Sequence, residues 1–313
     1  MKAVQLACQA MGTRFELALY GGERARLRAA GEEAITEIIR LHDDLSAFRH
    51  QSQIGRVNAE ASTGPMRVTQ ELFSLLNDIR RLSDLTDGAF DVTVGPLLAT
   101  WGFRGEVAGR PDERTIADAL DRVGFQHVLL NARERSVYFE RQGMRLDLGG
   151  VGKGFALDVA CDVLLSAGIA CALIHGGTST MRAIGLNPEG KPWKIGVRRP
   201  FAPDDEGLLE VIDLENEAMS VSAVSGRFFE ADGDVYGHVI DPRTGYPAGH
   251  ADLAVVFAPS AMEADALSTG LLVLGEAGVS MLEERVEGFR GASFHRKAVV
   301  ATSSRRERLA FPI

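Results

Sequence analysis

A glycine-rich run in the middle of the chain has the composition of a ligand-binding turn. It extends from Leu146 to Gly154 and carries Lys153 between two glycines. Glycines let the backbone approach a ligand closely, and free amides at a helix start attract anions. The run is not a Walker A loop, because Gly154 stands where Ser or Thr is required, and its glycine spacing does not fit the dinucleotide fingerprint. Two interpretations stay open: a tight turn that lets a helix pack on a sheet, or a site for a diphosphate-bearing ligand.

Two later segments carry titratable groups and oxygen donors. The segment from His238 to Gly245 combines a histidine with a carboxylate and a guanidinium, and it is either a capped turn or a site of proton transfer. Asp265 and Thr269 are four residues apart, so on a helix they share one face. A carboxylate with a hydroxyl is a poor zinc site but suits magnesium, which keeps water and phosphate oxygens as its other ligands. The alternative is that Asp265 only caps the helix.

Composition and missing motifs exclude several function classes. The 313 residues are 45% hydrophobic and 25% charged, which is typical of a globular protein. Lys and Arg total 34 against 43 for Asp and Glu, and this net charge of -9 makes nucleic acid an unexpected partner. The three cysteines form no zinc or disulfide pattern, and no apolar stretch reaches the roughly 18 residues of a membrane span. Metalloprotease, esterase and kinase signatures are absent from the sequence.

Hydrophobic periodicity predicts the elements that position these groups. Helices are expected over 32–45, from a cap at Thr69 to 85, and over 111–123, 155–167 and 261–274. Strands are expected over 11–20, 127–130, 136–140, 144–148, 170–174, 193–197, 209–214 and 254–257, with Cys8 in an earlier strand. A polar loop is expected between 45 and 69, and a surface loop or hairpin tip over 199–207. The irregular interleaving, without repeat or linker, predicts a mixed α+β fold in a single body over residues 1–313.

Together these segments resemble the ApbE-type family of FAD:protein FMN transferases over nearly the whole chain. The run from Gly88 to Leu97, followed by Trp101-Gly102-Phe103, is a specific match. The other matching motifs follow in the family's order: Met11-Gly12-Thr13, Ser46-Ala47-Phe48 with Ser52, Ile54 and Asn58, Asp147 through Asp158, Gly176-Gly177, His238 through Gly245, and Ala264 through Thr269.

The resemblance implies a fold around a central flavin cleft, an activity and a set of site residues. The activity is a magnesium-dependent transfer of FMN from FAD to a threonine of an acceptor flavoprotein through a phosphoester, with release of AMP. His238 matches a histidine linked to catalysis, as a base or an orienting group, and Asp265, Thr269 and a backbone carbonyl near Gly150 would hold Mg²⁺. The residues implied to line the FAD site are Met11, Phe48, Ala89, Phe90, Asp91, Asp147, Lys153 and Ile240.

The chain departs from the family pattern at three places. Phe48 stands where tyrosine is common, His175 stands where the family often has asparagine, and the segment 220–225 lacks the usual Thr-Ser-Gly. Two other functions remain open: a magnesium-dependent FAD pyrophosphatase that yields FMN and AMP, and a flavin-binding protein without turnover. The sequence as it stands shows no signal peptide or lipobox and predicts a cytoplasmic location, whereas removal of a leader would indicate the periplasm.

Overall fold

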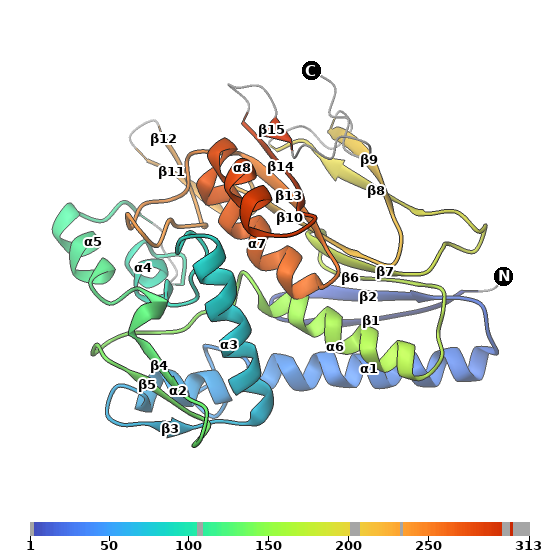
Figure 1. Ribbon diagram of the computed structural model, residues 1–313, viewed down its shortest axis with the longest axis horizontal. Coiled ribbons are helices and arrows are strands. Elements are labelled where there is room, and N and C mark those ends of the chain that lie inside the picture. The colour runs from blue at the N-terminus through green and yellow to red at the C-terminus, as the bar shows by residue number, and fades with distance from the viewer. Residues whose placement is uncertain (1–2, 105–108, 201–206, 232–233, 296–300, 303–313) are drawn as a thin grey trace.

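The computed structural model describes residues 3–104, 109–200, 207–231, 234–295 and 301–302. Its main feature is an eight-stranded sheet in the order β1-β2-β6-β7-β10-β13-β14-β15, in which all neighbours are antiparallel (Figure 1). These strands are β1 (Val4–Ala10), β2 (Thr13–Leu19), β6 (Ala172–Gly176), β7 (Thr180–Ile184), β10 (Ala218–Ala223), β13 (Leu253–Ala258), β14 (Arg290–Phe294) and β15 (Ala301–Thr302).

Smaller sheets and the helices complete the described part of the chain. The smaller sheets contain β3 (Met66–Arg67), β4 (Val128–Asn131), β5 (Ser136–Phe139), β8 (Trp193–Arg198), β9 (Leu208–Leu214), β11 (Phe228–Ala231) and β12 (Asp234–Gly237). The helices are α1 (Arg24–Asp44), α2 (Gln53–Glu60), α3 (Gln70–Leu85), α4 (Gly95–Thr100), α5 (Glu113–Leu120), the 3₁₀ turn η1 (Phe125–His127), α6 (Gly152–Ser166), α7 (Ala261–Leu274) and α8 (Glu276–Arg285). In the described ranges, no helix combines the length and the apolar character that crossing a membrane requires.

The main sheet separates two hydrophobic cores, because successive side chains of a strand point to opposite faces. Helices α1, α6 and α7 lie next to one another on one face, and Ile174 and Val256 belong to their core (Figure 1). Met181, Met219 and Val255 point to the other face, which the β8–β9 hairpin covers. The sheet is therefore buried on both sides over its central strands.

A third cluster forms around Trp101, which is fully buried at the end of α4. Its indole N–H donates to the carbonyl oxygen of Gly245 at 2.8 Å. Ile240 belongs to the same cluster, and Tyr236 of β12 packs against it. The cluster thus fixes the segment 238–245 against α4, which Figure 1 shows on the same side of the molecule as the β11–β12 hairpin.

Several of the predicted elements are confirmed by the structure. Thr69 caps α3 by accepting a hydrogen bond from the amide of Leu72 at 3.2 Å, and α7 covers 261–274 as expected. The strands predicted around 128, 136, 172, 193, 209 and 254 are present, and Cys8 lies in β1. Part of the loop expected over 199–207, residues 201–206, lies outside the described residues.

Two other predictions were wrong, and three predicted elements are present but begin at a different residue. The expected polar loop contains helix α2, which Ser52 caps by accepting from the amide of Gly55, and only one face of this polar helix is buried. The strand expected over 144–148 forms only an isolated bridge, from Arg145 to Val94. The expected strand from residue 11 begins at Thr13, because Met11 and Gly12 form the turn of the β1–β2 hairpin. Helix α1 begins at Arg24 and α6 at Gly152, both earlier than predicted.

Helices α6 and α7 touch at Gly154. A Cβ on this glycine would overlap the carbonyl carbon and oxygen of Ala261 at the start of α7, and a backbone carbonyl cannot rotate away as a side chain can. Gly154 thus has a packing role, but it brings α6 against helix α7, whereas the interpretation expected a turn that packs a helix on a sheet. This contact also explains how Lys153, one residue earlier, comes to lie next to α7.

Replacing Gly154 with alanine is expected to lower the free energy of unfolding by about 1–3 kcal/mol, the usual cost of forcing an extra carbon into a packed core. Gly152→Ala in the same helix is the matched control, since a Cβ there meets its nearest atoms at 3.8 Å, an ordinary contact. Urea unfolding of both variants measures the difference. Equal midpoints for the two variants would contradict close contact between α6 and α7.

Candidate active site

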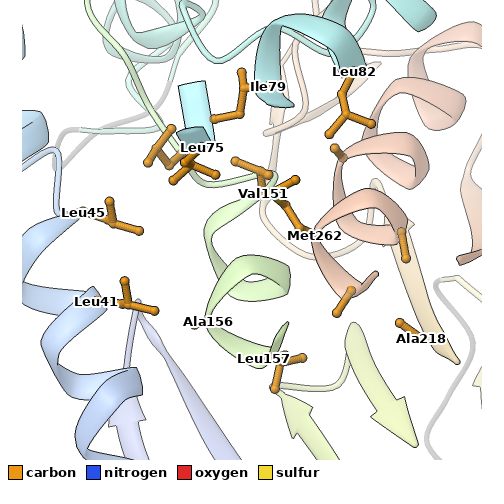
Figure 2. Packing of buried hydrophobic residues seen from close by; sticks show 14 of the residues in the cluster. Leu41, Leu45, Leu75, Ile79, Leu82, Val151, Ala156, Leu157, Ala218 and Met262 are labelled. Carbon is orange, nitrogen blue, oxygen red and sulfur yellow. The ribbon is translucent and has the colours of Figure 1, made fainter. Parts of the chain in front are cut away.

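The glycine turn is anchored in the core by Val151, which is fully buried. Figure 2 shows Val151 close to Leu75 of α3 and Met262 of α7. The amides of the turn mostly donate within the protein: Gly149 to Asp147 Oδ1 at 2.9 Å, Gly152 to the carbonyl of Leu148 at 2.8 Å, and Gly154 to Asp265 Oδ2 at 3.2 Å. The amides of Gly149 and Gly152 therefore stabilise the turn itself, and the amide of Gly154 connects it to α7. Positive charge beside the turn comes from side chains.

Asp265 is the most heavily hydrogen-bonded acid beside the turn. It lies inside α7 with 2% of its surface exposed, and the cap of the helix is Ser260, not Asp265. Lys153 Nζ lies 3.2 and 3.3 Å from its two carboxylate oxygens. The hydroxyls of Thr180 and Ser220 donate to Oδ1 at 3.2 and 3.3 Å. The carboxylate thus holds a fixed orientation and already faces a cation.

The donor set around Asp265 fits magnesium. Gly150 lies against Thr269, whose Oγ1 is 3.1 Å from the position that a Cβ on Gly150 would take. The available donors are a carboxylate, a hydroxyl and backbone carbonyls, all hard oxygens of the kind that Mg²⁺ prefers. In the described residues no group of three or more His, Cys, Asp and Glu side chains gathers.

Hydroxyl side chains of β7 and β10 form a network behind Asp265 that the sequence analysis did not assign. Ser220 and Ser222 are two apart in β10, so both face α7. Ser222 Oγ lies 2.9 Å from Ser268 Oγ and 3.4 Å from Thr269 Oγ1. The serines at 220 and 222, two residues apart in a segment noted only as a departure from the family pattern, were the signal that could have revealed this network.

The β1–β2 turn adds Met11 to the neighbourhood of the glycine turn. Met11 has a φ of 50°, which is unfavourable for a residue with a side chain. Its amide donates to Nδ1 of His42 at 3.0 Å, which holds the turn in place. The Met11 sulfur lies 3.8 Å from the position of a Cβ on Gly152. The sequence analysis missed His42, because nothing local in the sequence connects it to residue 11.

The Ala89-Phe90-Asp91 segment is buried beside α7. A Cε atom of Phe90 lies 3.5 Å from the position of a Cβ on Gly150, so the ring borders the glycine turn. The carboxylate of Asp91 accepts from the amide and hydroxyl of Thr93 and from the amide of Phe125, all at 2.7 Å. Burial raises the pKa of Asp91, while these hydrogen bonds act in the opposite direction. Its side chain thus holds the loop, and a contact of this segment with FAD stays a prediction.

His238 has the geometry of a neutral histidine with one free nitrogen. Its Nδ1 lies 3.2 Å from the carbonyl oxygen of Arg227, which can only accept, so Nδ1 carries the proton and Nε2 has a lone pair. Burial lowers the pKa of His238, the hydrogen bond to the Arg227 carbonyl acts in the opposite direction, and the charges of Arg227, Lys153 and Arg104 lower the pKa.

The rest of the 238–245 segment is a capped turn. Asp241 Oδ1 accepts from the amide of Arg243 at 2.9 Å, and its Oδ2 pairs with the Arg243 guanidinium at 2.8 Å. Ile240 is buried in the Trp101 cluster, away from the Asp265 network. The side chains of Asp241 and Arg243 are therefore paired with each other within this turn.

The structure places most of the predicted site residues around one turn. The residues in contact with the glycine turn, or part of it, are Met11, Phe90, Asp147, Gly150, Lys153, Asp265 and Thr269. Phe48 is 66% exposed. The guanidinium of Arg104 lies over one face of its ring and also pairs with Asp147. Ala89 and Ile240 are buried, and their roles, like those of the other residues, stay predictions.

Comparisons with known proteins show which family the sequence matches. The sequence profile of the ApbE family matches residues 11–290. A Vibrio cholerae protein named FAD:protein FMN transferase is 36% identical over 250 residues, which cover 77% of this chain and 73% of that protein. Its namesake in Escherichia coli K12 is 32% identical over 85% of this chain and 76% of its own length.

Solved structures show the same fold. The crystal structure of the ApbE protein of Thermotoga maritima superposes with a TM-score of 0.88 at 30% identity and covers 97% of this chain and 98% of its own. The flavin transferase ApbE of Vibrio cholerae has a TM-score of 0.84 at 28% identity, with the same coverage. The predicted α+β fold is thereby confirmed, and the chain belongs to the ApbE family.

Proposed function

We propose that this protein is a magnesium-dependent FAD:protein FMN transferase that uses a threonine of a flavoprotein as acceptor. The observation that carries the proposal is the contact of Asp265 and Lys153 beside the glycine turn, with oxygen donors from Gly150 and Thr269 on the same side. The named activity of the relatives, which match most of the chain, supports the same reaction. FAD is the substrate, and the acceptor flavoprotein is the second partner.

The proposed reaction is a phosphoryl transfer in which the enzyme mainly positions groups and offsets charge. The threonine oxygen forms a bond to the FMN-side phosphorus of FAD, and the bond from that phosphorus to the bridging oxygen breaks. AMP leaves with the electron pair of that bond. Bound at Asp265, Thr269 and the Gly150 carbonyl, magnesium would polarise the diphosphate and stabilise the leaving group.

Side chains of the protein supply the proton acceptor and further positive charge. Nε2 of His238 accepts the proton of the threonine hydroxyl, since this nitrogen carries the free lone pair of the neutral ring. The ammonium group of Lys153 lies beside the glycine turn, where it contacts the carboxylate of Asp265 and the carbonyl oxygen of Gly149. Hydroxyls of Thr180 and Ser220 keep Asp265 oriented while these groups act.

Incubation with FAD and Mg²⁺, with and without a candidate acceptor flavoprotein, tests the proposal. We expect AMP release to depend on the acceptor and the flavin fluorescence to remain on the denatured acceptor. An acceptor whose target threonine is replaced by valine is the control and should stay unlabelled. Rapid AMP release without acceptor would instead identify an FAD pyrophosphatase, and stoichiometric FAD binding without any AMP would identify a flavin-binding protein.

A further inference from the structure

The glycine turn carries two buried carboxylates, and Lys153 pairs with only one of them. Asp147 and Asp265 contribute two carboxylates, with 8% and 2% of their surfaces exposed. Lys153 pairs with Asp265. The amides of Gly149, Gly152 and Gly154 donate to protein acceptors, so they do not offset the charge of an anionic ligand. A side chain that offsets the charge of Asp147 therefore favours the binding of a diphosphate at this turn, in addition to magnesium and Lys153.

Arg104 is the cation that lies at Asp147. Its Nη2 pairs with Oδ2 of Asp147, while Oδ1 of the same carboxylate accepts from the amide of Gly149. The same Nη2 lies 3.2 Å from the position that a Cβ on Gly149 would take. The guanidinium is therefore at the surface of the glycine turn.

The same guanidinium lies over the exposed ring of Phe48, with 5.2 Å between its central carbon and the ring centroid. A planar guanidinium can stack on an aromatic ring with its face and still donate hydrogen bonds from its edge. The side chain of Arg104 keeps 26% of its surface exposed, so it is open to solvent and to a ligand. Its charge also reaches His238, whose pKa it helps to lower.

We propose that Arg104 is an FAD-binding residue of this enzyme and donates to the diphosphate of the substrate from its place between Phe48 and Asp147. The inference rests on the proposed function and adds a binding group that the sequence analysis did not assign. Guanidinium favours phosphate because its five N–H donors form a fixed fork that matches the phosphate oxygens. The pair with Asp147 and the ring of Phe48 hold that fork beside the turn, so little side-chain freedom is lost when the substrate binds.

The test compares the affinity of FAD with that of riboflavin, which has the flavin ring but no phosphate. Binding is followed by flavin fluorescence, in the presence of Mg²⁺, for the wild type and for Arg104→Ala, Arg104→Gln and Arg104→Lys. We expect Arg104→Ala and Arg104→Gln to lower the affinity for FAD by about 10- to 100-fold, the range for hydrogen bonds to charged groups. The affinity for riboflavin should stay nearly unchanged. Arg104→Lys should fall between these variants and the wild type, since it keeps the charge but loses the fork.

A surface arginine provides the matched control. Arg133 lies exposed in the turn between β4 and β5, and Arg133→Ala should bind both ligands as the wild type does. Thermal melting of each variant checks that it is folded. If Arg104→Ala does not fold, the Gln and Lys variants still provide the test.

Two results would overturn the inference, and they differ from a failure of the proposed function. Wild-type affinity for FAD in folded Arg104→Gln would show that the guanidinium does not reach the diphosphate. An equal loss of affinity for FAD and for riboflavin would show that Arg104 only shapes the flavin pocket through Phe48. If the wild type itself neither binds FAD nor transfers FMN, the proposed function fails before any variant is compared.

Discussion

Asp265→Asn is expected to reduce FMN transfer by more than 100-fold at saturating FAD and Mg²⁺. The substitution keeps the size of the side chain but removes the charge that faces Lys153 and that the metal site needs. A metal ion that neutralises a transferring phosphoryl group lowers the activation barrier by several kcal/mol, and about 1.4 kcal/mol corresponds to a tenfold change in rate. Initial rates of acceptor labelling, measured over a range of Mg²⁺ concentrations, give the size of the effect.

The Mg²⁺ dependence distinguishes a metal ligand from a structural acid. A weakened metal site should shift the Mg²⁺ concentration needed for half-maximal rate upward. Glu263→Gln is the control, because Glu263 lies on the same helix but pairs with Arg81 at the surface. It should retain the wild-type rate and the wild-type Mg²⁺ dependence. Unchanged activity of a folded Asp265→Asn variant would mean that the metal is bound elsewhere or is not used.

His238→Asn is expected to lower kcat by about 10²- to 10⁴-fold, the usual contribution of a positioned general base. Asparagine can replace the hydrogen bond to the Arg227 carbonyl, but it cannot take up a proton from a hydroxyl. His50→Asn is the control, since His50 is an exposed histidine with no predicted role. A loss of less than tenfold in His238→Asn would leave the imidazole with an orienting role.

The pH dependence of the wild type provides an independent measurement of the same group. The base acts as the neutral imidazole, and burial holds the pKa of His238 below the ordinary histidine value of about 6.5. The rate should therefore stay high as the pH falls to 6.5 and decline only at lower pH. Removal of a nearby positive charge, as in Arg104→Ala, should move this decline toward higher pH, because Arg104 is one of the charges that lower the pKa. A decline centred well above pH 6.5 in the wild type would contradict the burial of a neutral imidazole.

The same shift links protonation of His238 to stability. Between the lowered folded pKa and the unfolded value near 6.5, the unfolded chain binds more protons than the folded one at this residue. The contribution of neutral His238 is thus fully present above pH 6.5 and is lost as the pH falls through the folded value. His238→Asn should remove this part of the acid destabilisation, which urea unfolding at pH 7.5 and pH 5 can measure.

Helix caps, hydrophobic periodicity and residue type predicted the features that depend on residues close together in the sequence. Thr69 and the apolar period after it fixed the start of α3, because a cap and a buried face lie within one helix. Asp265 and Thr269 lie on one helix, and their oxygen chemistry follows from residue type alone. The polar helix α2 was missed, because the short run of buried residues at Ile54 and Val57 gives too weak a period. The strand expected over 144–148 was wrong, because a short apolar run does not determine its hydrogen-bonding partner.

Residue types and spacing determined the α+β class and the oxygen character of the Asp265 site, whereas the candidate base His238 was implied by the resemblance to the family. Only the tertiary structure decided that Lys153 faces Asp265 across 112 positions of the chain, that His42 holds Met11, and that Arg104 lies between Phe48 and Asp147. It also decided that the glycine amides donate mostly within the protein. The physical reason is that short-range patterns arise from backbone geometry, whereas these contacts arise from the packing of α6 against α7 and of distant loops around one turn.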